Sequence, residues 1–301
     1  MQNINPLISI GMPVYNEENR LRERLESIDD QSISNFKIII SDNGSTDKTQ
    51  EICEELSKKD KRIMYIRHEK NKGGFWNFDF VLRQAKTKYF VWASGDDIWS
   101  KEFLEKNIKV LEKNENIVGS IGETSIFNRI KNPSTNKIEI KVLRNTKKFQ
   151  YVHPVSGDKH KKIKFLLNYA MSAPVYAVYR TNKLQKAIKS IETMWMWDLA
   201  VLVNIIKEGD FEVIESAFLH KHQTERSTSV IEYMKKGKFS LIQILFLNVP
   251  FTFWCLKNLG LKIFLKNFVY FIKLNMEGEY TIIAEVVRMC KRITYRQKKY
   301  W

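Results

Sequence analysis

Apolar runs and helical spacings alternate along the first third of the chain. Four runs rich in β-branched and aromatic residues predict strands at Leu7 to Tyr15, Phe36 to Ser41, Arg62 to Arg67 and Tyr89 to Ala93. Between these runs apolar residues recur every three or four positions, which predicts amphipathic helices, the first of them with Asn16 as its N-cap. Repeated strand–helix units favour the α/β class, with a mostly parallel, twisted sheet flanked by helices.

The pattern becomes richer in strands after residue 117. Strand-like runs occur at Ile117 to Ile121, Ile138 to Leu143 and Val175 to Tyr179, and polar, lysine-rich segments separate them. A helix is predicted from Trp197 to Gly209, with a strand after it at Phe211 to Phe218. We expect the lysine-rich segments to form loops beside the site that the first half of the chain builds.

The segment from Phe239 to Leu274 has a different character. Phe239 to Leu256 has no charge over 18 residues, the length at which a membrane span becomes feasible, although several polar residues dilute it. In the next stretch Lys262, Lys266 and Lys273 fall on one helical face, and apolar residues cover most of the rest. We favour helices that lie on a membrane surface. The alternatives are a helical cap packed on the main domain and a true span.

Charge narrows the choice of partners. The chain has 50 Lys and Arg against 34 Asp and Glu, a formal net charge of +16, and 44% hydrophobic residues are ample for a packed core. From Ile231 onward the chain has 13 basic residues and only four acidic residues. Such an excess favours an anionic partner, which could be nucleic acid, an acidic membrane surface or a phosphorylated substrate.

Cysteine usage and the N-terminus bear on the compartment. The three cysteines, Cys53, Cys255 and Cys290, are far apart, so neither a disulfide framework nor a cysteine-based zinc site is indicated. Met1 to Pro6 lacks the basic cluster and apolar core of a secretory signal. We expect a cytoplasmic protein.

Two predicted strands stop abruptly at acidic residues and glycine. These are the runs from Ile38 to Asp47 and from Phe90 to Asp97. In open α/β sheets ligands bind outside the carboxyl ends of the strands, so both runs would deliver carboxylates to the same edge. Carboxylates at that edge suit a polyhydroxylated or metal-bound ligand, which indicates a sugar-handling enzyme.

Four short motifs give the chain a specific resemblance. They are Pro13-Val14-Tyr15-Asn16-Glu17, Ser41 to Asp47, Asn71-Lys72-Gly73-Gly74 and Ser94-Gly95-Asp96-Asp97. In this order, each closing a strand or opening a helix, they resemble glycosyltransferase family 2 over roughly Leu7 to Ile126. The resemblance implies the GT-A fold, which is Rossmann-like, and an inverting transfer of sugar from a nucleotide-sugar donor.

The resemblance also implies which residues bind the donor. Those expected to line the nucleotide-sugar site are Pro13, Tyr15, Glu17, Asp42, Asn71, Gly73, Gly74, Asp96, Asp97 and Arg226. Among them Asp42 would contact the base or the ribose, although Asp42-Asn43-Gly44 can also be read as a plain turn before a capped helix. Asn71 to Gly74 would let the backbone approach the donor at a helix start, where amide groups favour anions.

A divalent metal, Mn²⁺ or Mg²⁺, is the implied cofactor. Adjacent carboxylates repel each other unless a cation bridges them, and a hard cation would also bind the donor diphosphate. The first Asp of the family's Asp-x-Asp motif is Ser94 here, which leaves Asp96 as the metal-binding position. His222, after a predicted strand, is a second candidate ligand, and Arg226 would face the diphosphate. Alternatively, Asp96-Asp97 merely precedes a helix, and the segment around His222 is a solvated loop.

Inversion at an anomeric carbon requires a base on the acceptor hydroxyl, opposite the leaving group. Trp197-Asp198 stands where the family usually has Glu-Asp, so Asp198 is the implied catalytic base. The alternative is that Asp198 only stabilises the start of its helix through the helix dipole.

From the motifs and the resemblance we predict an inverting, metal-assisted glycosyltransferase with a UDP- or dTDP-sugar as donor. We expect it to act on a lipid-linked or polysaccharide acceptor at the cytoplasmic face of the inner membrane. Residues 1–229 would form the catalytic domain, with the nucleotide-sugar-binding part at 1–127 and the acceptor side at 128–229. Residues 230–301 would form a basic, membrane-associating helical extension. A nucleic-acid-binding protein and a sugar nucleotidyltransferase are the alternatives, although no nucleic-acid module is recognised and no nucleic-acid partner is expected.

Overall fold

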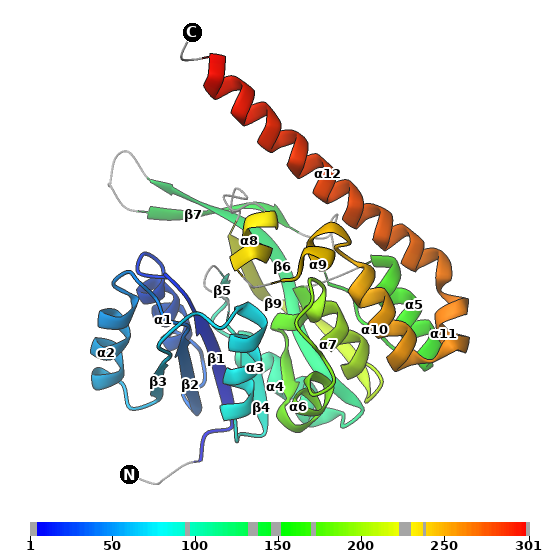
Figure 1. Ribbon diagram of the computed structural model, residues 1–301. Helices are drawn as coiled ribbons and strands as arrows, with labels where there is room; N and C mark the ends of the chain where they lie inside the picture. Colours follow the sequence, from blue (N-terminus) through cyan, green and yellow to red (C-terminus); the bar gives the residue numbers. More distant parts are fainter. Residues whose placement is uncertain are drawn as a thin grey trace.

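A computed structural model gives the fold of the chain (Figure 1), and the residues that it describes are 5–93, 97–131, 138–145, 152–169, 173–222, 230–236 and 239–298. The strands in these ranges are β1 (Ile8–Val14), β2 (Phe36–Asp42), β3 (Ile63–Arg67), β4 (Tyr89–Trp92), β5 (Asp97–Trp99), β6 (Ile117–Lys131), β7 (Ile138–Asn145), β8 (Val178–Arg180) and β9 (Asp210–His222). The helices are α1 (Leu21–Asp29), α2 (Thr49–Lys59), α3 (Gly74–Gln84), α4 (Phe103–Lys113), α5 (Lys159–Tyr169), the 3-10 turn η2 (Ala173–Tyr176), α6 (Thr181–Ile188), α7 (Trp197–Ile205), α8 (Val230–Lys236), α9 (Leu241–Leu245), α10 (Val249–Leu259), α11 (Leu261–Lys266) and α12 (Phe268–Lys298).

These strands join into one mixed sheet. Along the sheet the order is β3-β2-β1-β4-β8-β6-β9-β5, and β7 pairs with β6. The pairs among β1, β2, β3 and β4 are all parallel, as the strand–helix alternation predicts. From β8 onward antiparallel pairs enter, with only β6 and β9 running parallel. The predicted α/β class and the flanking helices are confirmed, and the predominance of parallel pairing belongs to the first half of the chain.

The first strands are apolar on both faces because helices cover both sides of the sheet. In β2 every residue except Lys37 is buried, and the three consecutive isoleucines from Ile38 to Ile40 are at most 2% exposed. β1 is equally buried over Ile8 to Met12. Rigid, buried strands of this kind hold the loops at their carboxyl ends in fixed positions, and the predicted site depends on those loops.

Two local predictions are corrected. Asn16 is not the N-cap of the first helix, because α1 begins only at Leu21, and Asn16 lies in the preceding loop with a φ of 56°. The predicted strand from Val175 to Tyr179 is a 3-10 turn, η2, followed by the short strand β8. Pro174 explains the turn, since proline fixes its own φ and has no amide hydrogen for a sheet ladder.

The uncharged stretch from Phe239 to Leu256 is broken into α9 and the first part of α10. Ser240 caps α9 in a capping box with Gln243, and Pro250 stands in the first turn of α10. In the part of the chain that the structure describes, no helix has both the length and the apolar character needed to cross a membrane. Among the three interpretations of this segment, a true span is therefore not supported by the described residues.

The C-terminal helices pack on the main body. Side chains of α10, α11 and α12, including Phe251, Cys255 and Phe271, belong to the same hydrophobic core as the strands. A second, smaller cluster joins α8, α9 and α12 through Met234, Ile244 and Ile282. The core therefore crosses the predicted domain boundary at residues 229 and 230, while the far end of α12 projects away from the body (Figure 1).

Candidate functional site

The loops after β1 and β2 are joined by backbone-to-side-chain hydrogen bonds. The Asn16 amide donates to Ser45 Oγ at 3.0 Å, and the Thr46 amide donates to Asn16 Oδ1 at 2.9 Å. The Glu17 amide donates to Thr49 Oγ1, the first residue of α2, at 2.8 Å. These bonds explain why Asn16 adopts a positive φ, which asparagine tolerates better than most residues. The two predicted nucleotide-binding loops thus form one rigid unit.

The third motif is attached to the same unit. Asn43 Nδ2 donates to Asn71 Oδ1 at 3.0 Å and to the Gly73 carbonyl at 3.1 Å, and the Lys72 amide donates to Asn43 Oδ1 at 2.9 Å. Gly73 has a φ of 97°, a conformation that favours glycine, and it leads directly into α3. The structure therefore brings together the segments that contain Pro13, Glu17, Asp42, Asn71, Gly73 and Gly74. Tyr15, in the first of these segments, is 42% exposed beside them.

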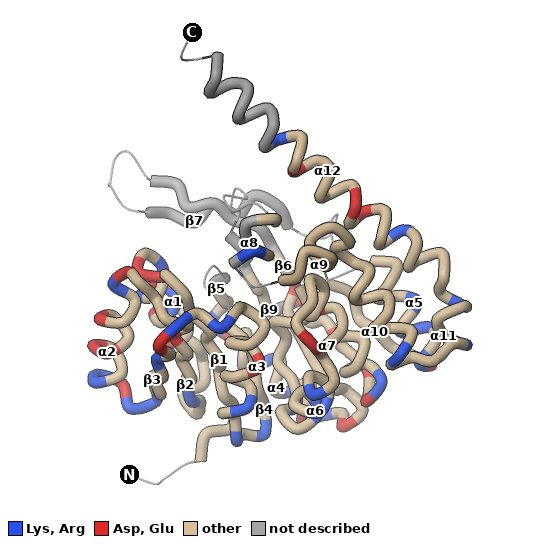
Figure 2. The backbone as a smooth tube through the Cα atoms, in the orientation of Figure 1, with Lys and Arg blue, Asp and Glu red and all other residues tan. Residues whose placement is uncertain are grey.

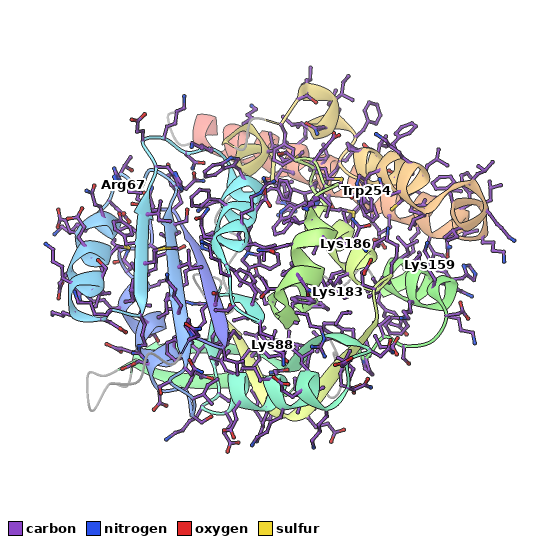
Figure 3. The ribbon with its side chains drawn as sticks, turned by 90° about the horizontal axis from the view of Figure 1, so that it is seen from below. Arg67, Lys88, Lys159, Lys183, Lys186 and Trp254 are labelled. Atoms are coloured by element: carbon purple, nitrogen blue, oxygen red, sulfur yellow. The ribbon has the colours of Figure 1, made fainter. Side chains whose placement is uncertain are left out.

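Asp42 is fully buried and has three partners. Its Oδ1 accepts the Ser45 amide at 2.8 Å, and its Oδ2 accepts Tyr65 OH at 3.0 Å and Arg67 Nη1 at 3.2 Å. Burial, followed by the charge of Asp42, raises the pKa of the Tyr65 phenol, which keeps it a hydrogen-bond donor. Figure 3 shows Arg67 at the end of the strands. A base or ribose can reach this carboxylate only after Tyr65 or Arg67 moves.

A buried polar network lies behind these loops. Ser41 Oγ donates to Asn77 Oδ1 at 2.6 Å and lies 2.8 Å from His68 Nε2, while Asn77 Nδ2 donates to the Ser41 carbonyl at 2.9 Å. Burial, and then the charge of Lys72, lowers the pKa of His68, which therefore favours the neutral imidazole. The network fixes the start of α3 against the end of β2.

Asp198 stands in the first turn of α7 in a mostly dry environment. Burial raises the pKa of its carboxyl from the usual 3.8 to about 6, and the Leu199 amide, which donates to Oδ1 at 2.8 Å, opposes this shift. A carboxylate with a pKa near 6 is ionised at neutral pH and is still basic enough to accept a proton. This is the property required of the base that the sequence predicts.

Aromatic residues connect Asp198 with the donor loops. The ring of Trp197, the residue before Asp198, lies 5.0 Å from that of Phe78 and 5.4 Å from that of Phe75, both on α3. A small pocket joins the two segments, and its lining is Lys72, Gly73, Gly74, Phe75, Trp76, Thr193, Met194, Trp195, Trp197 and Phe239. The start of α7, which carries Asp198, therefore adjoins the loop that carries Gly73 and Gly74.

The predicted metal site falls mostly outside the described residues. Asp96 and Arg226 lie outside them entirely, and for Asp97 and His222 only the backbone is described. That backbone places Asp97 of β5 opposite Lys221 of β9, one residue before His222. Among the described residues no group of three or more His, Cys, Asp or Glu could hold a metal ion. Carboxylate oxygen and imidazole nitrogen are both ligand types that bind Mn²⁺, so the residue types named by the prediction suit this cation.

Several residues of the site were not found by sequence reasoning. Tyr65 and Arg67 hold Asp42, and His68 and Asn77 form the buried network. The signal for Tyr65 and Arg67 was their place in a short strand, where alternate side chains face the same way. His68 lacks any metal-ligand spacing, so only its neighbours in space could identify its role.

Comparison with known proteins gives a consistent picture. A family model described as "Glycosyl transferase family 2" matches residues 9–186, more than half of the chain. An uncharacterized glycosyltransferase of Methanocaldococcus jannaschii is 40% identical over 114 residues, which cover 37% of this chain and 39% of that protein. TuaG of Bacillus subtilis, named for teichuronic acid biosynthesis, is 33% identical over 111 residues, 37% of this chain and 44% of TuaG. The matches thus span less than half of the length of these relatives.

Solved structures show the same fold. S. aureus TarS 1-349 in complex with UDP-GlcNAc has a TM-score of 0.54 at 18% identity, over 84% of this chain and 71% of TarS 1-349. The mannosyltransferase PcManGT from Pyrobaculum calidifontis, in complex with GDP-Man and Mn²⁺, has a TM-score of 0.55 at 13% identity, over 95% of this chain and 76% of PcManGT. At such low identity the likeness shows the fold alone.

Proposed function

Because this chain belongs to glycosyltransferase family 2, we propose that it transfers a sugar, with inversion, from a nucleoside diphosphate donor to a glycan or lipid-linked acceptor. The proposal rests on one observation: the three motif loops, which contain Glu17, Asp42 and Gly73, lie together next to the helix that carries Asp198. Asn43 joins the loop of Asp42 to that of Gly73, and Gly73 lines one pocket with Trp197. These segments lie far apart in the sequence, and a nucleotide-sugar must contact several of them at once.

The start of α3, on the proposed donor side of the site, has features that favour binding of an anion. The first amides of α3 point toward the Gly73 loop as the positive end of the helix dipole, and Lys72, which lies 4.3 Å over the Trp76 ring, adds a charge. Relatives in fold bind UDP-GlcNAc and GDP-Man. For this chain we propose a UDP- or dTDP-sugar, with Tyr15 and Arg67 near the nucleotide and Asp42 holding Arg67 in place.

A divalent cation is part of the proposal. Asp96 would hold Mn²⁺ or Mg²⁺, with Asp97 beside it and His222 as a second ligand, and Arg226 would face the diphosphate. When bound, the cation would neutralise charge on the diphosphate as it leaves. PcManGT, which shares the fold, is solved with Mn²⁺.

Asp198 would act on the acceptor. Its carboxylate would take the proton of an acceptor hydroxyl while that oxygen attacks the anomeric carbon from the face opposite the donor diphosphate. The bond between the anomeric carbon and the diphosphate oxygen would break, and the nucleoside diphosphate would leave with the bonding electrons. The pKa of about 6 supports this role, because the carboxyl is ionised at neutral pH.

A panel of nucleotide-sugars tests the proposal. Purified protein should release a nucleoside diphosphate from one of them in the presence of Mn²⁺ or Mg²⁺, and Asp96→Ala should abolish that release. Lys61→Ala, a change of an exposed residue at the opposite end of α2 from the motif loops, is the control and should leave the rate unchanged. Turnover of the panel that is the same in Asp96→Ala would refute the metal role. Absence of release from every nucleotide-sugar, with and without a lipid-linked acceptor, would refute the proposed function.

A further inference from the structure

Exposed apolar side chains are concentrated on the C-terminal helices. Of the 17 large apolar side chains that lie exposed among the described residues, 15 fall between residues 241 and 287. They are Leu241, Ile242, Leu245, Phe246, Phe253, Leu261, Leu265, Phe268, Val269, Ile272, Met276, Tyr280, Ile283, Val286 and Val287. Scattered apolar residues are normal on a protein surface, but a concentration of this kind marks an interaction surface.

These side chains are exposed on helices that are already packed. Trp254 of α10 is 8% exposed and donates from Nε1 to the Ser190 carbonyl at 2.9 Å (Figure 3). Phe264 of α11 stacks on Phe271 of α12 with ring centroids 4.7 Å apart. Each helix therefore buries one apolar face in the body and presents a second apolar face outward.

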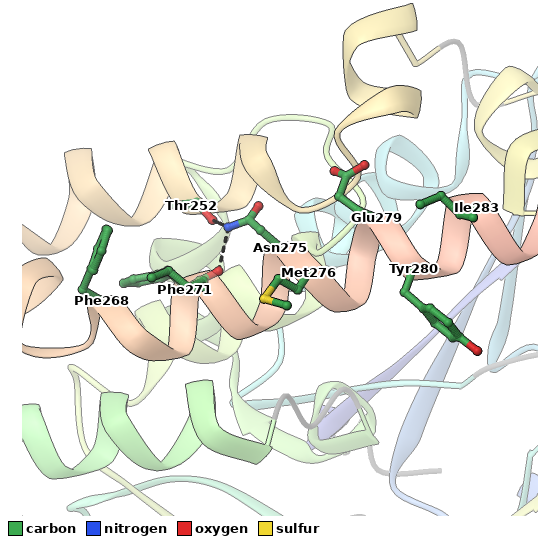
Figure 4. Close-up of a pocket in the computed structure, with 9 residues that line it drawn as sticks. Thr252, Phe268, Phe271, Asn275, Met276, Glu279, Tyr280 and Ile283 are labelled. Atoms are coloured by element: carbon green, nitrogen blue, oxygen red, sulfur yellow. Dashed lines mark hydrogen bonds between the residues drawn. The ribbon is translucent and has the colours of Figure 1, made fainter.

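The outward face of α12 forms a shallow groove beside α10. Figure 4 shows its lining, in which Thr252 from α10 accepts a hydrogen bond from Asn275 Nδ2 at 2.8 Å. The remaining residues that line it come from α12 and are Phe268, Phe271, Ile272, Asn275, Met276, Glu279, Tyr280 and Ile283. Ile272, Met276, Tyr280 and Ile283 form its exposed apolar stripe, at the spacing of one helical face.

The charge around this surface is mostly positive, although α12 also places Glu277 and Glu279 there. Residues 233–276 contain seven lysines and no aspartate or glutamate. The lysines are Lys235, Lys236, Lys238, Lys257, Lys262, Lys266 and Lys273. In Figure 2, α9 and most of α10 are free of charge, and basic residues gather around α11 and the start of α12. Lys262 and Lys266 are exposed next to Leu261 and Leu265.

We propose that this surface, the exposed face of α9, α10, α11 and the first half of α12, binds an anionic lipid bilayer. Apolar side chains would enter the boundary between headgroups and acyl chains, and the lysines would lie at the headgroup phosphates. Charge favours a bilayer over a second copy of the chain, because the exposed Lys257, Lys262, Lys266 and Lys273 outnumber Glu277 and Glu279, and a symmetric contact would leave most of these lysines without an acidic partner.

The surface is connected to the candidate site. Gln243 of α9 donates to the Thr193 carbonyl at 3.0 Å, and Phe239 lines the pocket that contains Trp195 and Trp197. Binding to a bilayer would therefore hold the segment before Asp198 close to the lipid surface. Resting on the proposed function, this placement fits a lipid-linked acceptor; the binding itself requires no sugar transfer.

Co-sedimentation with vesicles tests the proposal without any measurement of activity. The full chain should bind vesicles of equal parts phosphatidylcholine and phosphatidylglycerol, and binding should weaken in high salt and be at least about tenfold lower on phosphatidylcholine alone. Leu261→Ser/Leu265→Ser/Val269→Ser removes exposed apolar groups and should lower binding about tenfold or more. Lys262→Glu/Lys266→Glu should do the same through charge.

A matched control changes the same charges elsewhere. Lys58→Glu/Lys61→Glu alters exposed residues at the end of α2, on the other side of the molecule from α11 (Figure 1), and should leave binding unchanged. All variants change exposed residues, and unaltered thermal unfolding would show that they fold. Equal binding of the α11 variants and the parent would overturn the proposal. So would a dimer in sedimentation velocity that the apolar triple variant dissociates, because the surface would then belong to a second copy.

Discussion

Asp198→Asn should lower activity and raise stability, because the Asp198 carboxylate is the proposed base and its burial destabilises the fold. Burial raises the pKa of this carboxyl from 3.8 to about 6. At neutral pH the ionised carboxylate is therefore better solvated in the unfolded chain than in the folded one, and its ionisation lowers the stability of the fold. A shift of about two units corresponds to about 3 kcal/mol at 1.36 kcal/mol per unit. Asparagine keeps an oxygen for the Leu199 amide, which donates to Oδ1, and it carries no charge. The substitution should therefore raise the free energy of unfolding by up to about 3 kcal/mol at about pH 7.5.

The sign of the pH dependence follows from the same shift. Below the usual 3.8 the carboxyl is protonated in both states and has no effect on stability. Between 3.8 and about 6 the unfolded chain ionises first, so the parent loses stability relative to Asp198→Asn as the pH rises. Above about 6 both states are ionised and the full difference remains. Urea unfolding of both proteins at about pH 4 and about pH 7.5 measures this difference.

The same substitution should remove the base. If Asp198 accepts the acceptor proton, the parent rate should rise with an apparent pKa near 6, and Asp198→Asn should be slower by about 10²- to 10⁴-fold and lack this rise. Asp198→Ala, which also removes the oxygen that the Leu199 amide uses, should gain less stability. If Asp198→Asn unfolds more easily at about pH 7.5 and retains full activity, the carboxylate only supports the start of α7 and the reasoning is wrong.

Three further predictions concern the loops around the donor. Gly44→Ala should lower the free energy of unfolding, measured in urea, by about 2 kcal/mol and should weaken donor binding. The reason is that Gly44 has a φ of 74° and that the new Cβ would lie 2.9 Å from the Lys70 backbone. A variant as stable as the parent would contradict this strain. Asn77→Ala should lower the free energy of unfolding by about 2 kcal/mol, since it removes the amide that bonds both the Ser41 hydroxyl and the Ser41 carbonyl and leaves the hydroxyl with His68 alone. Calorimetry that shows no greater loss than a surface substitution would count against the network. Burial lowers the pKa of His68 below its usual 6.5, so neutral His68 contributes its full stability above pH 6.5, and that contribution declines as the pH falls below this value. The thermal stability of His68→Gln should therefore decline less than that of the parent between about pH 7 and about pH 5. An equal decline in both proteins would assign the pH dependence to other groups.

The order of elements in the first half of the chain was predictable because each is encoded locally. Alternation of apolar runs with helical spacing predicts β1 to β4 and the helices between them, and the turn residues place the end of β2 at Ser41, one residue before its observed end at Asp42. Antiparallel pairing around β8 was not predicted, since β8 is a three-residue strand. Such a short segment carries almost no periodic signal, and its place in the sheet depends on β4 and β6 on either side.

The sequence predicted which segments form the candidate site, but it predicted few of the contacts between their side chains. The motif loops of Glu17, Asp42 and Gly73 do lie together, as strand ends of a parallel sheet must. Tyr65 and Arg67, which hold Asp42, come from another strand. Their alternation in that strand places both on one face, but only the packing of β3 beside β2 shows that this face meets Asp42. For Asp96 and Arg226, which lie outside the described residues, the assigned roles stay predictions.

The sequence by itself determined periodicity, turn chemistry and charge, and with them the α/β class, the acidic strand ends and the apolar, basic character of the C-terminal segment. These properties are local, because they depend on residues a few positions apart. Only the tertiary structure decided that burial raises the pKa of Asp198, that Asp42 is closed off by Arg67, and which apolar residues of α9 to α12 remain exposed. Solvent exposure and pKa depend on which distant elements exclude water from a side chain, and that packing is fixed only when the whole chain has folded.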